Sequence, residues 1–207
     1  MYVFSRIRRI NNAHGRAAMA AAAEAATRAS EIIGMPVALW TPVLSAGIGT
    51  VVWSTTAEHL ADLQAADDAI TGSNEFMDWV EQNDSLFIGS LDDSVLQVLH
   101  GNVTGDPPAY VNVTRAVAAP GSVSEAMEMG MQLTEVVERI TGVATTFGSY
   151  VTGTFGELAW AGALPDLQAA EAANAAMAAS DELRKLIDNA GHVYQPGVTS
   201  MLLRRLN

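Results

Sequence analysis

The sequence contains one ten-residue segment twice. Residues 60–69 read LADLQAADDA and residues 164–173 read LPDLQAAEAA, and they share the same Leu, Asp, Leu, Gln and three Ala residues. When short insertions are allowed, Trp53 also aligns with Trp160. A match of this length predicts an internal duplication in which each copy forms one structural unit.

The segment NVTGDPPA at residues 102–109 is the expected connection between the two copies. Gly105 and the pair Pro107–Pro108 favour a linker, because neither residue type readily continues a helix or a central strand. We therefore expect a first repeat over residues 1–101, a linker over 102–109 and a second repeat over 110–207.

Both copies contain predicted elements in the same order. In the first copy, strands are expected over residues 2–10, 37–41, 50–54 and 85–89, with helices over 13–33, from Thr55 or Thr56 onward, and after Asn74. In the second copy, strands are expected over residues 110–118, 145–151, 157–160 and 192–195, with helices over 123–141, on the repeated segment, and after Ser180. Gly34 and Gly142 follow the first helix of each copy, where glycine is the usual terminating residue. Ser122 and Glu125 have the spacing of a capping box.

The order strand, helix, strand, strand, helix, strand is that of a ferredoxin-like unit, whose four-stranded antiparallel sheet is covered by helices on one face. The third strand of each copy carries apolar residues on both faces, so a single copy would expose an apolar sheet face. We expect an α+β fold in which two tandem ferredoxin-like βαββαβ units pack sheet to sheet as an α/β barrel within one chain.

This duplicated arrangement resembles the dimeric α/β-barrel superfamily. That superfamily includes antibiotic-biosynthesis monooxygenases, NIPSNAP-like proteins and the heme-bearing chlorite dismutases. The resemblance covers nearly the whole chain and is carried by element order and duplication. It implies a small-molecule site between the sheet and the helices of a unit.

The resemblance also implies particular site residues. Cofactor-independent monooxygenases of the superfamily line their pocket with Asn, Trp and a basic or hydroxyl side chain, which would correspond to Asn112 and Trp160 in the second copy. The first copy has Val3 or Phe4 in place of the asparagine. Heme-bearing members use a histidine on a helix as the iron ligand, and none of the four histidines here aligns with another across the repeat.

Two repeated residue types are candidate ligand contacts. Arg6 and Arg115 superpose within the triplets Phe-Ser-Arg and Val-Thr-Arg, and a guanidinium in that place could hold a carboxylate or phenolate through two parallel bonds. The alternative is that each arginine pairs with an acid such as Glu157. Trp53 and Trp160 could orient an aromatic ligand, or could simply pack in the core. The candidate ligand-binding residues are Arg6, Trp53, Asn112, Arg115 and Trp160, and the sequence identifies no catalytic residue.

Composition narrows the possible partners. The sequence has 11 basic and 23 acidic residues, a net charge of -12, which argues against nucleic acid or an anionic membrane surface as a partner. The absence of cysteine excludes disulfides, thiolate metal sites and a thiol nucleophile, and no metal-binding motif is present, so no cofactor is expected. The uncharged run over residues 32–57 is interrupted by Gly and Pro, so no membrane-spanning helix and a cytoplasmic location are expected.

Three functions are compatible with these features. The first is a small-molecule-binding barrel protein resembling a cofactor-independent monooxygenase, with a small apolar or aromatic ligand in a cavity of roughly 300 Å³ or more. The second is a non-catalytic structural or assembly subunit that associates with itself, since the alanine-rich helix over residues 13–33 has little bulk and something must approach it closely. The third is a heme-binding barrel. Whether the protein is an enzyme stays open at this point.

Overall fold

The structure is a computed structural model that describes residues 1–101, 103 and 105–207. It contains two compact units. Unit 1 comprises Met1–Val95 with Arg204–Asn207, and unit 2 comprises Leu96–Leu203. The predicted linker over 102–109 includes Asn102 and Thr104, which lie outside the described residues.

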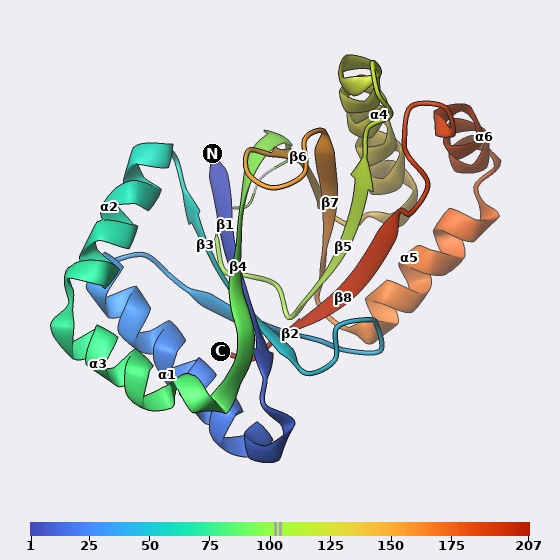
Figure 1. Cartoon of the computed structure of the whole chain (residues 1–207). Coiled ribbons are helices and arrows are strands. Elements are labelled where there is room, and N and C mark those ends of the chain that lie inside the picture. The colour runs from blue at the N-terminus through green and yellow to red at the C-terminus, as the bar shows by residue number, and fades with distance from the viewer. Residues whose placement is uncertain (102, 104) are drawn as a thin grey trace. The chain divides into compact units, whose positions relative to one another are not determined.

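Unit 1 places three helices along one face of its strands (Figure 1). Strand β3 pairs antiparallel with both β1 and β2. The elements of this part of the chain are β1 (Tyr2–Ile10), α1 (Gly15–Ile33), β2 (Ala38–Pro42), β3 (Thr50–Ala57), α2 (Leu60–Gly72), α3 (Asn74–Asn83) and β4 (Phe87–His100), with short 3-10 turns over Asn12–His14 and Asp84–Leu86.

Unit 2 has the same succession of elements. Strand β7 pairs antiparallel with both β5 and β6, and α4 and α5 pack against this sheet (Figure 1). The elements are β5 (Tyr110–Val117), α4 (Val123–Thr141), β6 (Thr145–Tyr150), β7 (Glu157–Leu164), α5 (Leu167–Ala179), α6 (Asp181–Ala190) and β8 (Thr199–Arg205).

The predicted packing of two ferredoxin-like units sheet to sheet is wrong. The described strands form one closed barrel in the order β1-β3-β2-β8-β5-β7-β6-β4. Strand β4 continues to His100, and its segment Leu96–His100 pairs with β6. Alternation in a sequence reports which side chains share a face of a strand, but not which strand lies at each edge. Closure into a barrel satisfies those edges, which a pair of open sheets would leave free.

Both glycines predicted to end helices do so. Gly34 and Gly142 adopt left-handed backbone conformations with φ of 67° and 69°, and each donates its N–H to the carbonyl four residues earlier. An L-residue with a side chain is strained in this conformation, which is why glycine marks these two helix ends.

The predicted start of the second helix at Thr55 or Thr56 is wrong. Strand β3 continues to Ala57, which pairs with Tyr2 of β1, and the Thr55 hydroxyl donates to the carbonyl of Pro36. The helix starts at Leu60, where the His59 and Asp62 side chains form the capping box. Extension of the β1–β3 ladder therefore overrides the capping signal.

Two predictions in the second copy are also wrong. Residues 192–195 form no strand, because His192 and Val193 lie in a turn and Tyr194 makes one isolated bridge with Ala118. The last strand, β8, lies further along the chain. Ser122 makes no capping bond through its side chain, and Glu125 instead lies 3.0 Å from His192.

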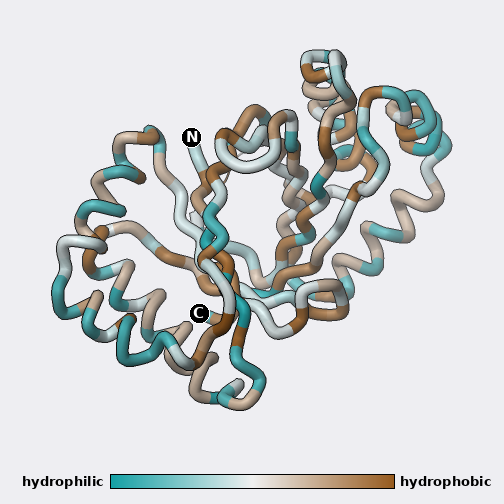
Figure 2. The backbone as a smooth tube through the Cα atoms, in the orientation of Figure 1, coloured by the Kyte–Doolittle hydropathy of each residue, from teal (hydrophilic) through white to brown (hydrophobic). Residues whose placement is uncertain are grey.

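Each unit has its own core. In unit 1 the buried residues Leu39, Val51 and Phe87 pack with alanines of α1, and in unit 2 Phe147, Leu158 and Val193 pack with Ala126 of α4. Figure 2 shows hydrophilic and hydrophobic residues alternating along the helices, as expected for helices with one packed face. None of the helices within the described residues has the length and hydropathy needed to cross a membrane.

Candidate functional site

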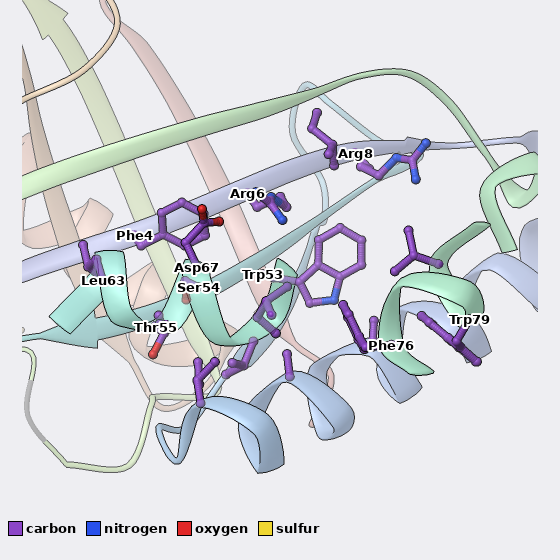
Figure 3. A pocket seen from close by; sticks show the side chains of 18 of the residues that line it. Phe4, Arg6, Arg8, Trp53, Ser54, Thr55, Leu63, Asp67, Phe76 and Trp79 are labelled. Atoms are coloured by element: carbon purple, nitrogen blue, oxygen red, sulfur yellow. The ribbon is translucent and has the colours of Figure 1, made fainter. Parts of the chain in front are cut away.

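Unit 1 contains a cavity of about 200 Å³ between its sheet and its helices. This volume is smaller than the 300 Å³ expected from the sequence. Figure 3 shows Trp53 near the middle, with Phe76 and Trp79 on one side and Phe4, Leu63 and Asp67 on the other. The cavity is lined from β1 by Phe4, Arg6 and Arg8, from β3 by Trp53, Ser54 and Thr55, from β4 by Phe87 and Leu91, from α1 by Ala25, Ala29 and Ile33, from α2 by Leu63, Ala66, Asp67 and Ile70, from α3 by Phe76, Trp79, Val80 and Asn83, and by Val37.

The alanines of α1 leave room for this cavity. Ala18, Ala22 and Ala26 are completely buried in the core, while Ala25 and Ala29 form part of the cavity wall. A methyl group extends only a short distance from the helix, so the space beyond it is kept open by the larger residues of α2 and α3. The lack of bulk on this helix therefore has a role within unit 1 itself.

Aromatic rings form much of the wall. The Trp53 and Phe87 rings meet edge-on with centroids 6.0 Å apart, and the Phe76 and Trp79 rings stack at 5.8 Å. Trp53 Nε1 donates to the carbonyl of Ala22 at 2.9 Å. The single donor of this indole is thus already satisfied by α1, and Trp53 can offer a ligand its ring face or edge.

Arg6 lies directly opposite Trp53 in the β1–β3 ladder. Its Nε and NH2 donate to the two carboxylate oxygens of Asp93 at 2.8 and 2.7 Å, and its guanidinium lies 5.6 Å from the Phe4 ring centroid. The hydrogen bonds that Arg6 donates to Asp93 raise the pKa of Arg6 above its ordinary value, against the opposing effect of burial. Arg6 is therefore a charged residue of the cavity wall that already forms a bidentate ion pair with Asp93.

Arg8 lies two positions further along β1 and also lines the cavity. Its NH2 donates to Asp84 at 2.8 Å, and its guanidinium lies 4.8 Å from the Phe87 ring centroid. Only 12% of its side chain is exposed. Its Nε is buried and has no hydrogen-bond partner within the described chain. Arg8 is thus a charged residue of the cavity wall, and one of its donors is buried without a hydrogen-bond partner.

The sequence-predicted residues of unit 2 do not form an equivalent group. Arg115 lies opposite Ala159 rather than Trp160, so it projects from the other face of the sheet. Its NH1 lies 3.6 Å from Glu157, the alternative that the sequence left open, and its guanidinium lies 4.8 Å from the Tyr150 ring centroid. The predicted superposition of Arg6 on Arg115 is therefore wrong by one residue.

Asn112 and Trp160 have structural partners of their own. Asn112 Oδ1 accepts from the Ser200 hydroxyl at 3.0 Å, and Trp160 Nε1 donates to the carbonyl of Gly130 at 3.1 Å. Of the five candidate residues, the structure brings Arg6 and Trp53 together in the unit 1 cavity and places Asn112, Arg115 and Trp160 in unit 2.

Sequence reasoning did not identify Arg8, Phe76 or Phe87 as parts of this cavity. The signal for Arg8 was present, because residues two apart on a strand share a face and Arg6 was already a candidate. Phe76 and Phe87 gave no such signal, since apolar residues at helical or strand spacing look the same whether they fill a core or line a cavity.

The unit 1 cavity does not fit heme. Its volume lies below that of typical cofactor pockets, about 300 Å³ or more. No histidine lines it, although all four histidines of the sequence are described: His14 and His59 are exposed, His192 faces Glu125, and His100 lies 3.8 Å from Glu138. No group of three potential metal-ligating side chains occurs within the described residues.

The fold is similar to several solved structures. A proposed monooxygenase of Fusobacterium nucleatum superposes with a TM-score of 0.72 at 10% sequence identity, over 100% of this chain and 92% of that one. An anthrone oxidase-like protein gives 0.67 at 13% identity, over 100% and 91%. A chlorite dismutase variant of Candidatus Nitrospira defluvii gives 0.56 at 13% identity, over 99% and 91%. No protein-family model and no curated protein matches the sequence. At these identities the likeness shows a shared barrel fold, the one seen in monooxygenase-like and chlorite dismutase-like proteins.

Proposed function

We propose that unit 1 binds a small molecule with a planar, apolar ring system in its cavity and that the chain oxidises this molecule in a monooxygenase-like reaction. The observation that carries the proposal is the aromatic cavity between the sheet and the three helices, walled by Trp53, Phe76, Trp79 and Phe87. The names of the similar structures, a proposed monooxygenase and an anthrone oxidase-like protein, support oxidation as the chemistry.

The cavity volume limits the size of the ligand. An engineered cavity of about 150 Å³ holds benzene, and drug-sized ligands need about 300 Å³ or more. A cavity of about 200 Å³ therefore suits one ring or two fused rings. Flat molecules are favoured because the stacked Phe76 and Trp79 rings and the Trp53 indole offer flat or edge-on contacts.

The proposed reaction needs only dioxygen and the substrate. A methylene group that is activated by a neighbouring carbonyl or ring loses two hydrogens and gains one oxygen atom, which makes it a carbonyl. The second oxygen atom leaves with the two hydrogens as water, so the substrate itself supplies all four electrons that reduce dioxygen. The chain holds the molecule in the cavity, while Trp53 fixes the plane of its ring.

A matched pair of variants tests the site. Ala29→Leu adds bulk to the cavity wall, whereas Ala20→Leu adds the same bulk at an exposed position of the same helix. We expect calorimetric titration with 2-tetralone to show binding to the wild type and to Ala20→Leu, and at least about tenfold weaker binding to Ala29→Leu. Equal binding to all three proteins, or to none, would remove the proposed site.

Oxidation is tested separately from binding. Dissolved oxygen is followed with an electrode in the presence of 2-tetralone, and the carbonyl product is quantified. We expect one dioxygen consumed for each carbonyl formed, and a lower rate in Ala29→Leu. Binding of 2-tetralone without oxygen uptake would leave the binding site in place and refute the oxidation.

Self-association is a second candidate function, favoured by apolar side chains that the chain leaves exposed. Leu44 and Ile48 of the β2–β3 loop are 83% and 74% exposed, and Phe155 of the β6–β7 loop is 89% exposed. Such residues mark contact surfaces when they cluster. We expect light scattering to give a mass above that of one chain, and Phe155→Ser or Leu44→Ser to lower it, while Ile187→Ser on α6 leaves it unchanged. A monomeric wild type would refute self-association.

A further inference from the structure

We propose that the ligand of the unit 1 cavity carries an anionic oxygen, a carboxylate or a deprotonated phenol, and that Arg8 recognises it. This inference rests on the proposed function and names the class of molecule that the site takes. It is carried by the state of the Arg8 side chain, whose Nε is a charged donor without an acceptor.

A buried donor without a partner is rare, because its desolvation is not repaid by a hydrogen bond. Two other residues of this wall have satisfied donors: Trp53 Nε1 donates to Ala22, and Arg6 Nε and NH2 donate to Asp93. Arg8 Nε is the buried side-chain polar atom of the described residues that lacks a partner. An acceptor supplied by a ligand would remove this deficit.

The charge of Arg8 is also incompletely balanced. Its ion-pair partner Asp84 is 69% exposed, whereas the Arg8 side chain is 12% exposed. Water screens the charge of an exposed carboxylate, so Asp84 compensates the buried guanidinium only weakly. An anion within the apolar cavity would be screened much less, and its attraction to Arg8 would be correspondingly stronger.

Other charges at the wall do not cancel this preference. Arg6 is held by both oxygens of Asp93 and so adds little net charge. Asp67 of α2 lines the cavity and would repel an anion, but its side chain is exposed and screened. The ligand is therefore expected to place its ring among the aromatic residues and its oxygen toward β1, where Arg8 lies.

The test compares three ligands with one ring system. 2-Naphthoate carries a carboxylate, 2-naphthamide carries a neutral acceptor oxygen, and 2-methylnaphthalene carries neither. We expect the wild type to bind 2-naphthoate about tenfold or more tighter than the other two, since hydrogen bonds to charged groups contribute more than neutral ones. Equal affinity for naphthoate and naphthamide would overturn the requirement for an anion.

Variants of Arg8 and Arg9 test whether Arg8 is the residue that recognises the anion. Arg8→Met keeps the stem of the side chain out to the Nε position and removes the donors, and Arg9→Met makes the same change at the exposed neighbouring position on β1. We expect Arg8→Met to lose about tenfold in affinity for 2-naphthoate and to keep its affinity for 2-methylnaphthalene within about twofold, while Arg9→Met changes neither. Arg8→Lys, which keeps the charge without a donor at the Nε position, should also lose affinity for 2-naphthoate if the geometry of Nε matters.

The outcomes separate the two proposals. If none of the three naphthalenes binds the wild type, the proposed function fails. If all bind alike, or if Arg8→Met weakens 2-naphthoate and 2-methylnaphthalene equally, the site stands and Arg8 does not recognise an anion. A melting temperature for each variant confirms that the comparison is made on folded protein.

Discussion

Arg6 and Trp53 lie directly opposite each other on β1 and β3, whereas the residue opposite Trp160 on β5 is Thr114. Opposite residues of an antiparallel ladder project from the same face. Arg6 therefore shares the helix-covered face with Trp53, and Arg115, one position beyond Thr114, projects from the other face. Two arginines that look equivalent in sequence thus lie in different environments.

This difference predicts opposite results for two similar variants. Arg6→Met leaves the Asp93 carboxylate without its partner, and this negative charge should weaken binding of 2-naphthoate to unit 1 about threefold to tenfold, with little change in stability because the Arg6–Asp93 pair is partly exposed. Arg115→Met should leave that affinity unchanged. It should lower the stability by about 1–3 kcal/mol, because Glu157 is only 19% exposed and loses its partner. Calorimetric titration and thermal unfolding of both variants provide the measurements.

A second prediction concerns the close packing of Gly130 on α4 against Phe147. A β-carbon added at Gly130 would overlap the Phe147 ring. Gly130→Ala should therefore destabilise the protein by about 1–3 kcal/mol, which lowers the melting temperature by about 2–10 °C, even though alanine is the better helix former. A higher melting temperature would show that helix propensity outweighs the clash.

Unit 1 suggests a second change that should compensate for Gly130→Ala. There, the Trp53 indole donates to the carbonyl of Ala22, and Leu39 lies opposite Trp53, just as Phe147 lies opposite Trp160. We expect Gly130→Ala with Phe147→Leu to be more stable than the sum of the two single changes, because the smaller side chain makes room for the added methyl group. Strict additivity in thermal unfolding would argue against a direct clash.

Local features of the fold were predictable because local physics determines them. Strand β1 and helix α4 have the expected bounds within one residue, and the helices before Gly34 and Gly142 end at the expected glycines. Thr55 shows the limit, since its capping signal is genuine in sequence but β3 continues past it. The closed strand order also depends on which strand edges pair. The alternation of apolar and polar residues along a strand does not specify those pairings.

The candidate site was predictable only in part. Trp53 and Arg6 stood out as repeated residues, and both line the cavity. The repeat itself misled the comparison of Arg6 with Arg115, because a shift of one residue moves a side chain to the opposite face of a strand. The importance of Arg8 depends on a missing hydrogen-bond partner, which is a property of the folded packing and cannot be found in the sequence.

The unsatisfied Arg8 Nε leads to a prediction about stability. Replacing a buried, unpaired polar group by an apolar one of similar length is often neutral or stabilising. Arg8→Met should therefore keep the melting temperature of the ligand-free protein within about 2 °C of the wild type or raise it, although an ion pair with Asp84 is lost. Arg8→Ala should lower it, because the stem of the side chain no longer packs at the Phe87 ring. A large loss of stability in Arg8→Met would indicate that Asp84 contributes more than its exposure implies.

A last prediction concerns alkaline pH. Burial raises the pKa of Tyr194 above its ordinary value of about 10, and its hydroxyl donates to the carbonyl of Ala126 at 2.7 Å. Above pH 10 the unfolded chain releases this proton while the folded chain keeps it, so the unfolded state binds fewer protons and stability falls as pH rises. Tyr150, whose pKa is also raised chiefly by burial, contributes in the same direction.

Tyr194→Phe should cost about 1 kcal/mol of stability at pH 8 through the lost hydrogen bond, and the melting temperature of the variant should then fall less steeply than that of the wild type between pH 9.5 and 11.5. Parallel pH profiles would show that Tyr194 titrates alike in the folded and unfolded chains.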